Sequence, residues 1–120
     1  MFKVFRKFFG KRQIEPEALL AYFYRLPEKI EVSWEKDGQY IIGRIKTDDK
    51  EFLTQGVDSD DFIEMVNDAV YSAYEIPNDY IEVVSQLRPY FPKPEEKEKL
   101  ESVAVTRSRF STHKAIPQRA

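Results

Sequence analysis

The sequence predicts a single α+β domain in which one helix packs across a three- to four-stranded antiparallel sheet. Two neighbouring segments, residues 29–36 and 39–46, alternate apolar and polar side chains, which is the period of strands with one wet face. A longer segment after Asp58 has apolar residues at helical spacing. A chain of 120 residues has the usual length for one hydrophobic core.

Two helical segments are expected before the sheet. Residues 1–12 place phenylalanines at near-helical spacing among lysines and arginines, and Gly10 is expected to end this amphipathic segment. We expect its apolar face to pack on the domain; the alternative is a basic arm for a membrane surface or nucleic acid. Pro16 suits the first turn of a second helix, which Pro27 ends. Residues 1–27 are thus an expected N-terminal helical arm.

A hairpin forms the centre of the predicted sheet. Asp37-Gly38 stands between the two alternating segments, and an Asp-Gly pair favours a type I′ turn with positive φ at both central positions. Residues 51–55 form a short third strand, which Gly56 closes. We expect the sheet and its covering helix to make up a domain over residues 28–92.

The helix that covers the sheet is predicted from its cap and its apolar stripe. The carboxylate of Asp58 can accept hydrogen bonds from the backbone N–H groups of the first turn. Ile76-Pro77 ends this helix, and Asn78 can cap a shorter one. The apolar stripe consists of Phe62, Val66, Ala69, Val70 and Ala73.

Residues 93–120 are expected to form a charged linker and a basic tail. The run Glu95 to Glu101 is interpreted as a solvated spacer, with a helix as the alternative. Residues 102–110 contain β-branched side chains and are a candidate fourth strand at a sheet edge. The end from Ser111 is expected to be loose.

Charge is unevenly distributed, although the formal net charge is only −2. The middle of the chain is acidic, and we expect the acidic side of the covering helix to bind a basic partner through Asp60, Asp61, Glu64 and Asp68. Both ends are basic. The alternative is that these ends bind nucleic acid, through Lys3, Arg6, Lys7, Lys11, Arg12, Arg107 and Arg109.

The residue types needed for catalysis are scarce. The chain has no cysteine, its four glycines are isolated, and its one histidine, His113, falls in the expected tail. The spacing of Asp61, Glu64 and Asp68 would suit one hard cation, but a solvated acidic face is favoured. We therefore expect a protein that is not an enzyme and needs no cofactor or metal. The lack of cysteine and of a long apolar run favours a cytoplasmic location without a membrane span.

The order of these elements resembles the HicB-like antitoxin family. The likeness is carried by residues 32–45 with the turn Glu35-Lys36-Asp37-Gly38-Gln39-Tyr40, by Thr54-Gln55-Gly56, and by the helix from Phe62 to Val70. The chain departs from the family at residues 48–52, where the family usually has a Leu-Pro-Gly-Cys-like stretch. It also lacks, after Pro94, the pair of periodic helices that would form a helix-turn-helix.

The resemblance implies a partial ribonuclease-H-like fold and a role in toxin–antitoxin systems. The chain would bind and mask a small basic RNA-cleaving toxin of the HicA type. We also expect it to form a homo-oligomer. The alternative function is a nucleic-acid-associated regulatory or oligomerisation domain that uses its basic ends.

Overall fold

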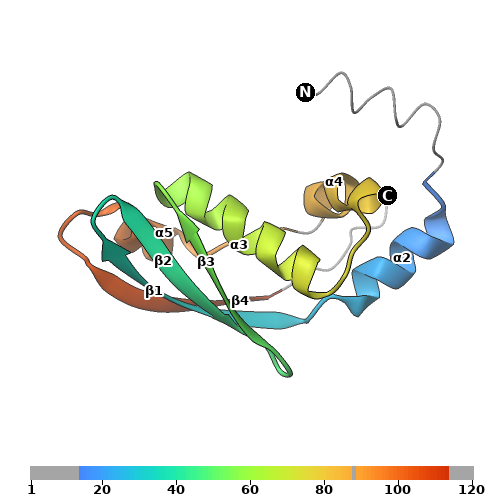
Figure 1. Cartoon of the computed structure of the whole chain (residues 1–120), viewed down its shortest axis with the longest axis horizontal. Coiled ribbons are helices and arrows are strands. Elements are labelled where there is room, and N and C mark those ends of the chain that lie inside the picture. Colours follow the sequence, from blue (N-terminus) through green and yellow to red (C-terminus); the bar gives the residue numbers. More distant parts are fainter. Residues whose placement is uncertain (1–13, 88, 114–120) are drawn as a thin grey trace, which may run out of the picture.

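The computed structural model describes residues 14–87 and 89–113 (Figure 1). It is an α+β fold with a four-stranded antiparallel sheet in the order β3-β2-β1-β4, as the alternating segments predict. Residues 1–13, which include about half of the expected arm, lie outside the described residues. In chain order the elements are α2 Pro16–Arg25, β1 Lys29–Asp37, β2 Tyr40–Lys46, β3 Glu51–Gly56, α3 Ser59–Ala73, α4 Asn78–Leu87, α5 Pro94–Glu101 and β4 Arg107–His113.

The β1–β2 hairpin has a different turn from the one expected. Asp37 pairs with Tyr40, so Gly38 and Gln39 are the central turn residues. Only Gly38 has a positive φ, 64°, which is the pattern of a type II′ turn. The prediction of a type I′ turn is wrong because Asp37 belongs to the strand, and Gln39 avoids the left-handed region that disfavours side chains.

Helix α3 begins where the sequence predicts and lies very close to the sheet. The Asp58 carboxylate accepts a hydrogen bond from the Asp61 backbone N–H at 2.8 Å, and the Asp61 carboxylate accepts one from the Val57 N–H at 2.9 Å. These two bonds satisfy donors that a helix start would otherwise leave unpaired. A Cβ at Gly56 would lie 2.6 Å from the backbone N and Cα of Phe62, so the helix can approach only over a glycine.

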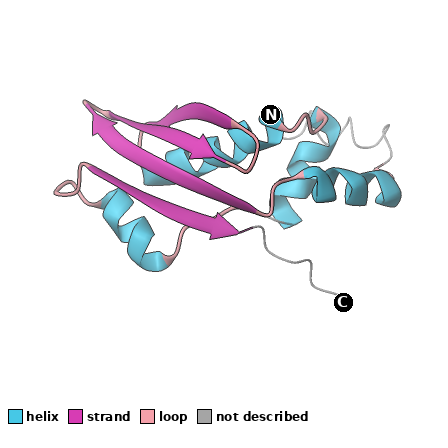
Figure 2. Ribbon diagram, turned by 90° about the horizontal axis from the view of Figure 1, so that it is seen from below, coloured by secondary structure: helices cyan, strands magenta, loops and turns pink. Residues whose placement is uncertain are grey.

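Among the elements that the structure describes, helices cover one face of the sheet and leave the other face open. Helix α3 packs on β3 and β2, and α5 packs beside β4 on the same side (Figure 1). Helices α2 and α4 lie beyond the end of the sheet opposite α5. Figure 2, turned by 90°, shows the strands in front of α3 from the uncovered side.

Helix α5 corrects the interpretation of residues 95–101 as a solvated spacer. Its Leu100 is only 1% exposed and belongs to the hydrophobic core. The Nζ of Lys97 pairs with Asp60 of α3 at 3.1 Å and with Glu101 at 2.9 Å. The spacer interpretation is wrong because one buried leucine and one bridging lysine fix a helix that is otherwise polar.

Strand β4 pairs antiparallel with β1 along its whole length, from Lys29 opposite His113 to Glu35 opposite Arg107. The candidate fourth strand is therefore real, but it begins after residues 102–106 and includes Ser111. The expectation of a loose end from Ser111 is wrong as far as His113, because the side chain of Thr112 is buried and donates to the carbonyl oxygen of Phe91 at 2.7 Å.

A buried asparagine fixes the connector between α4 and α5. The Asn67 side chain of α3 donates to the carbonyl oxygen of Tyr90 at 2.9 Å and accepts from the Tyr90 backbone N–H at 2.6 Å. The Tyr90 hydroxyl in turn donates to the carbonyl oxygen of Pro27. Leu26, Val66 and Phe110 all join this single core, so it takes in residues from the arm, the middle and the tail of the chain. Within the described residues, no helix has the length and apolar character needed to cross a bilayer.

Candidate functional site

On the open face of the sheet, the strands present side chains that no helix in the described part of the chain covers. Alternate residues of each strand point to this face, because successive side chains of a strand point to opposite sides. In β1 these are Glu31, Ser33 and Glu35, which are exposed, while Ile30, Val32 and Trp34 are buried beneath the helices. Residues directly opposite these three in the neighbouring strands point to the same face, so the register identifies the outward residues of β2, β3 and β4.

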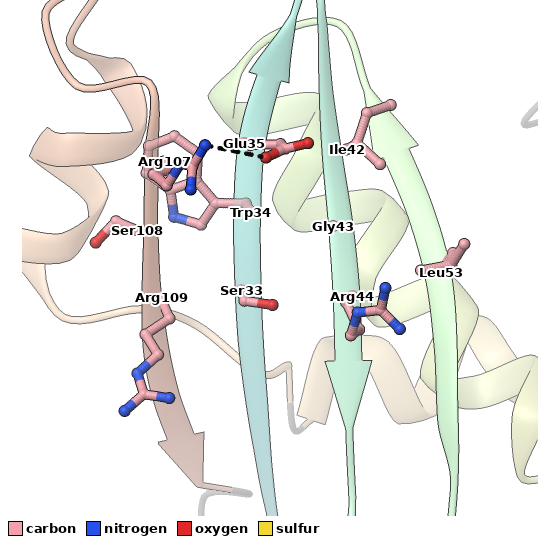
Figure 3. A pocket seen from close by; sticks show the side chains of 10 residues that line it. All are labelled: Ser33, Trp34, Glu35, Ile42, Gly43, Arg44, Leu53, Arg107, Ser108 and Arg109. Carbon is pink, nitrogen blue, oxygen red and sulfur yellow. Dashed lines mark ion pairs between the residues drawn. The ribbon is translucent and has the colours of Figure 1, made fainter.

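Three arginines surround a serine on this face. Ser33 of β1 lies opposite Arg44 of β2 on one side and opposite Arg109 of β4 on the other. Arg107 lies two residues from Arg109 along β4, opposite Glu35. Figure 3 shows the three guanidinium groups on the same side of the sheet with the small Ser33 side chain between them. We call Arg44, Arg107, Arg109 and Ser33 the arginine cluster.

A shallow hollow of about 520 Å³ lies over the arginine cluster and extends onto β2 and β3. Two apolar side chains, Ile42 and Leu53, form its other half (Figure 3). Leu53 is 62% exposed although it is a large apolar residue in a strand. The hollow therefore joins a cationic half and an apolar half, which is a combination suited to binding another molecule.

The arginines of the hollow form only exposed ion pairs, or none, with acidic residues that the structure describes. Arg107 lies 4.0 Å from a Glu35 oxygen, and both side chains are largely exposed, at 80% and 60%. Arg44 lies 3.0 Å from Glu51, again with both side chains about half exposed. Arg109 has no ion pair or hydrogen bond with any other residue that the structure describes. Exposed ion pairs of this kind are weak and exchange readily for other partners.

The four acidic residues predicted for partner binding divide into two pairs. Asp60 pairs with Lys97, and Asp61 is held in the cap of α3. Glu64 and Asp68 are exposed one helical turn apart, and their side chains form no hydrogen bond or ion pair within the described ranges. Partial burial raises the pKa of Asp68 above its ordinary value. Glu64 and Asp68 are thus the two acidic residues of α3 that have no ion pair or side-chain hydrogen bond within the described ranges.

The predicted basic residues fall into two groups as well. Lys3, Arg6, Lys7, Lys11 and Arg12 lie outside the described residues. Arg107 and Arg109 belong to the arginine cluster. The sequence interpretation missed Arg44 and the apolar pair beside it. The alternation of β2 and β3 already indicates that Arg44, Ile42 and Leu53 point to the open face. Only the strand register shows that Arg44 and Arg109 lie on either side of Ser33.

The described residues contain no group of three or more histidine, aspartate or glutamate side chains placed to hold a metal ion. His113 lies at the end of β4, opposite Lys29, rather than in a loose tail. Comparison with protein families, with curated proteins and with solved structures finds no significant match to this chain.

Proposed function

We propose that this chain is a protein-binding module of the HicB-like antitoxin type that masks a small basic RNA-cleaving toxin in the cytoplasm. The observation that carries the proposal is the outer face of α3, where Glu64 and Asp68 are exposed and uncompensated. Asp61 caps α3 and Asp60 is paired with Lys97, so Glu64 and Asp68 are the two acidic residues of α3 without an ion pair or side-chain hydrogen bond in the described part of the chain. We call Glu64 and Asp68 the acidic pair.

The residues that resemble the family also support the proposal through their roles in the scaffold. Gly56, the last residue of the Thr-Gln-Gly stretch, lies under the first turn of α3 and allows its close approach. The Thr54 hydroxyl donates to the carbonyl oxygen of Met65 at 3.4 Å, farther along the same helix. These residues fix α3 on the sheet, and a rigid helix presents its charges at constant positions, which favours specific binding.

A basic partner suits the electrostatics of this helix. Complementary charge accelerates encounter between proteins, and RNA-cleaving toxins of this type are basic because they bind a polyanion. Because rim charges act mainly on the association rate, the effect of the acidic pair is expected there rather than in the stability of the fold.

The test begins with the tagged chain, isolated at low salt from cells of its source, and with a small basic protein that copurifies with it. We expect the double variant Glu64→Lys with Asp68→Lys to associate with that protein about tenfold more slowly at low ionic strength, and the difference to shrink as salt is raised. The matched control is Glu95→Lys with Glu98→Lys on the exposed side of α5, which changes the net charge equally.

Two outcomes would contradict the proposal. The first is an association rate that is the same for the acidic-pair variant and the parent chain, or one that falls equally in the α5 control. The second is a copurified partner whose RNA cleavage is absent or is unaffected by the parent chain. Slower association together with suppression of RNA cleavage by the parent chain would support both the surface and the antitoxin role.

A further inference from the structure

We propose that the hollow on the open sheet face docks an acidic protein segment that also carries apolar side chains. This surface lies on the opposite side of the sheet from α3, so the inference does not depend on the acidic pair or on the antitoxin proposal.

The arrangement of the arginines suits carboxylates. Neighbouring strands lie about 4.8 Å apart, so Arg44 and Arg109, which flank Ser33, are anchored roughly 10 Å from each other. Long arginine side chains on both sides of a small serine can converge on one carboxylate above it. Guanidinium groups bind carboxylates through two parallel hydrogen bonds, which makes arginine more selective for such groups than lysine.

The apolar half of the hollow distinguishes a protein segment from a nucleic acid. Ile42 and Leu53 offer aliphatic contacts, whereas binding of single-stranded nucleic acid relies on aromatic side chains that stack on bases. The one aromatic residue that lines the hollow, Trp34, is only 4% exposed, so its ring is buried and offers no stacking surface.

The arginines are available to such a partner. The Arg107–Glu35 pair is long and exposed, and Arg109 lacks an ion pair within the described ranges. A volume of about 520 Å³ accommodates a few side chains of a docked segment. Binding would exclude water from the guanidinium groups, so that bonds which are weak in solvent would become stronger.

The probe for the test is a fluorescein-labelled peptide of twelve residues made of glutamate and leucine, whose binding to the full chain is followed by fluorescence anisotropy. Three further probes have the same length: a lysine and leucine peptide, a glutamate and serine peptide, and a uridine oligonucleotide. We expect the glutamate and leucine peptide to bind most tightly. Changing leucine to serine removes the apolar contacts, and changing glutamate to lysine removes the ionic ones.

The decisive variant is Arg107→Thr with Arg109→Thr, because threonine retains strand propensity at both positions. We expect it to bind the peptide about tenfold more weakly or worse. The matched control is Lys29→Thr with Lys46→Thr, which removes equal charge from the same face outside the hollow. A second variant, Leu53→Thr, should weaken the glutamate and leucine peptide but leave the glutamate and serine peptide unchanged.

Several results would overturn the inference. The first is that Lys29→Thr with Lys46→Thr weakens binding as much as Arg107→Thr with Arg109→Thr does. The second is that the lysine and leucine peptide binds as tightly as the glutamate and leucine peptide. The third is that the glutamate and leucine peptide shows no measurable binding. Tighter binding of the oligonucleotide would show a nucleic-acid surface in its place. Light scattering is performed on the same samples, and a dimer that only Arg107→Thr with Arg109→Thr dissociates would identify a second copy of this chain as the occupant.

Discussion

The close approach of α3 to the sheet limits which side chains fit at two glycine positions. Gly43 and Gly56 both lie against Phe62, which is fully buried. At Gly43 an added Cβ would meet the end of the phenyl ring, whereas at Gly56 it would meet backbone atoms of the helix. A ring can rotate or shift, but a helix backbone moves only as a unit. Gly56 is therefore the more stringent of the two positions.

We predict that Gly56→Ala destabilises the fold by about 1 to 3 kcal/mol, because overpacking forces α3 away from β3. The measurement is the free energy of unfolding in urea. The control is Gln55→Ala, one residue earlier and exposed, which should change that free energy by less than about 0.5 kcal/mol. If Gly56→Ala were as stable as Gln55→Ala, the close approach of Phe62 would not limit this position.

One residue conformation was not predictable from the sequence. Helix α3 ends with the Ile76 backbone N–H bonded to the Tyr71 carbonyl and the Glu75 N–H bonded to the Ser72 carbonyl, which is the Schellman pattern. The residue with positive φ is Glu75, at 58°, where glycine is usual. The Arg25 guanidinium from α2 donates to the carbonyl oxygens of Tyr74 and Glu75, and this long-range contact has no local sequence signal.

At the scale of elements, a polar contact joins the β2–β3 turn to the end of α3. The Tyr74 hydroxyl donates to a carboxylate oxygen of Asp49 at 2.6 Å and also lies 2.7 Å from the Thr47 hydroxyl. The hydrogen bond from Tyr74 is the main reason that the pKa of Asp49 lies below its ordinary value of 3.8. The turn and the helix are thus coupled through one ionised carboxylate.

We predict that this contact makes part of the stability depend on pH. Because the pKa of Asp49 is lowered in the folded state, its contribution to the free energy of unfolding is fully present above about pH 4 and is lost as pH falls through the folded pKa. Tyr74→Phe should therefore destabilise the protein at pH 7 more than at pH 3. Urea unfolding of both proteins at the two pH values measures this difference.

The control for this contact is Asp49→Asn, which keeps a hydrogen-bond acceptor but cannot ionise. In an Asp49→Asn background, the cost of Tyr74→Phe should be nearly the same at pH 7 and at pH 3. A cost that still falls with pH in that background would assign the pH dependence to another group.

The elements with strong local signals were predicted well, and those held by distant contacts were not. The hairpin, the third strand and α3 follow from alternation, turn residues and a cap, and all three occur where expected. Helix α5 has a polar sequence whose only buried anchor is Leu100, so its composition resembles a linker. The start of β4 was misplaced because the chain turns at residues 103–104 after α5, and β4 begins only at Arg107.

At the scale of the whole molecule, the fold class was predictable and the arginine cluster was not. Alternation shows which residues of a strand share a face, but it does not show which strands are neighbours. The cluster exists because β4 pairs with β1 and β2 pairs with its other side, so that Arg109 and Arg44 flank Ser33. That strand order is a product of the complete sheet, and no single segment of the sequence contains it.

We predict that a chain ending at Thr106 does not fold cooperatively, whereas a chain ending at His113 melts like the full chain. Removing β4 takes Phe110 out of the core, and loss of one buried phenylalanine costs about 3 to 5 kcal/mol. Small domains have total stabilities of only about 5 to 15 kcal/mol. Circular dichroism during heating measures the transition, and a sharp transition in the shorter chain would show that β4 is dispensable.

The pairing of β1 with β4 also has a consequence for synthesis on the ribosome. The two strands are neighbours in the sheet, yet β2, β3 and three helices are translated between them. Until β4 emerges, β1 is an edge strand whose backbone N–H and C=O groups are unpaired on one side. Strands of other nascent chains could pair with this edge, and the apolar side chains of Val32 and Trp34 would favour such contacts. The charges of Glu31 and Glu35 on the alternate positions oppose such misassembly throughout that interval.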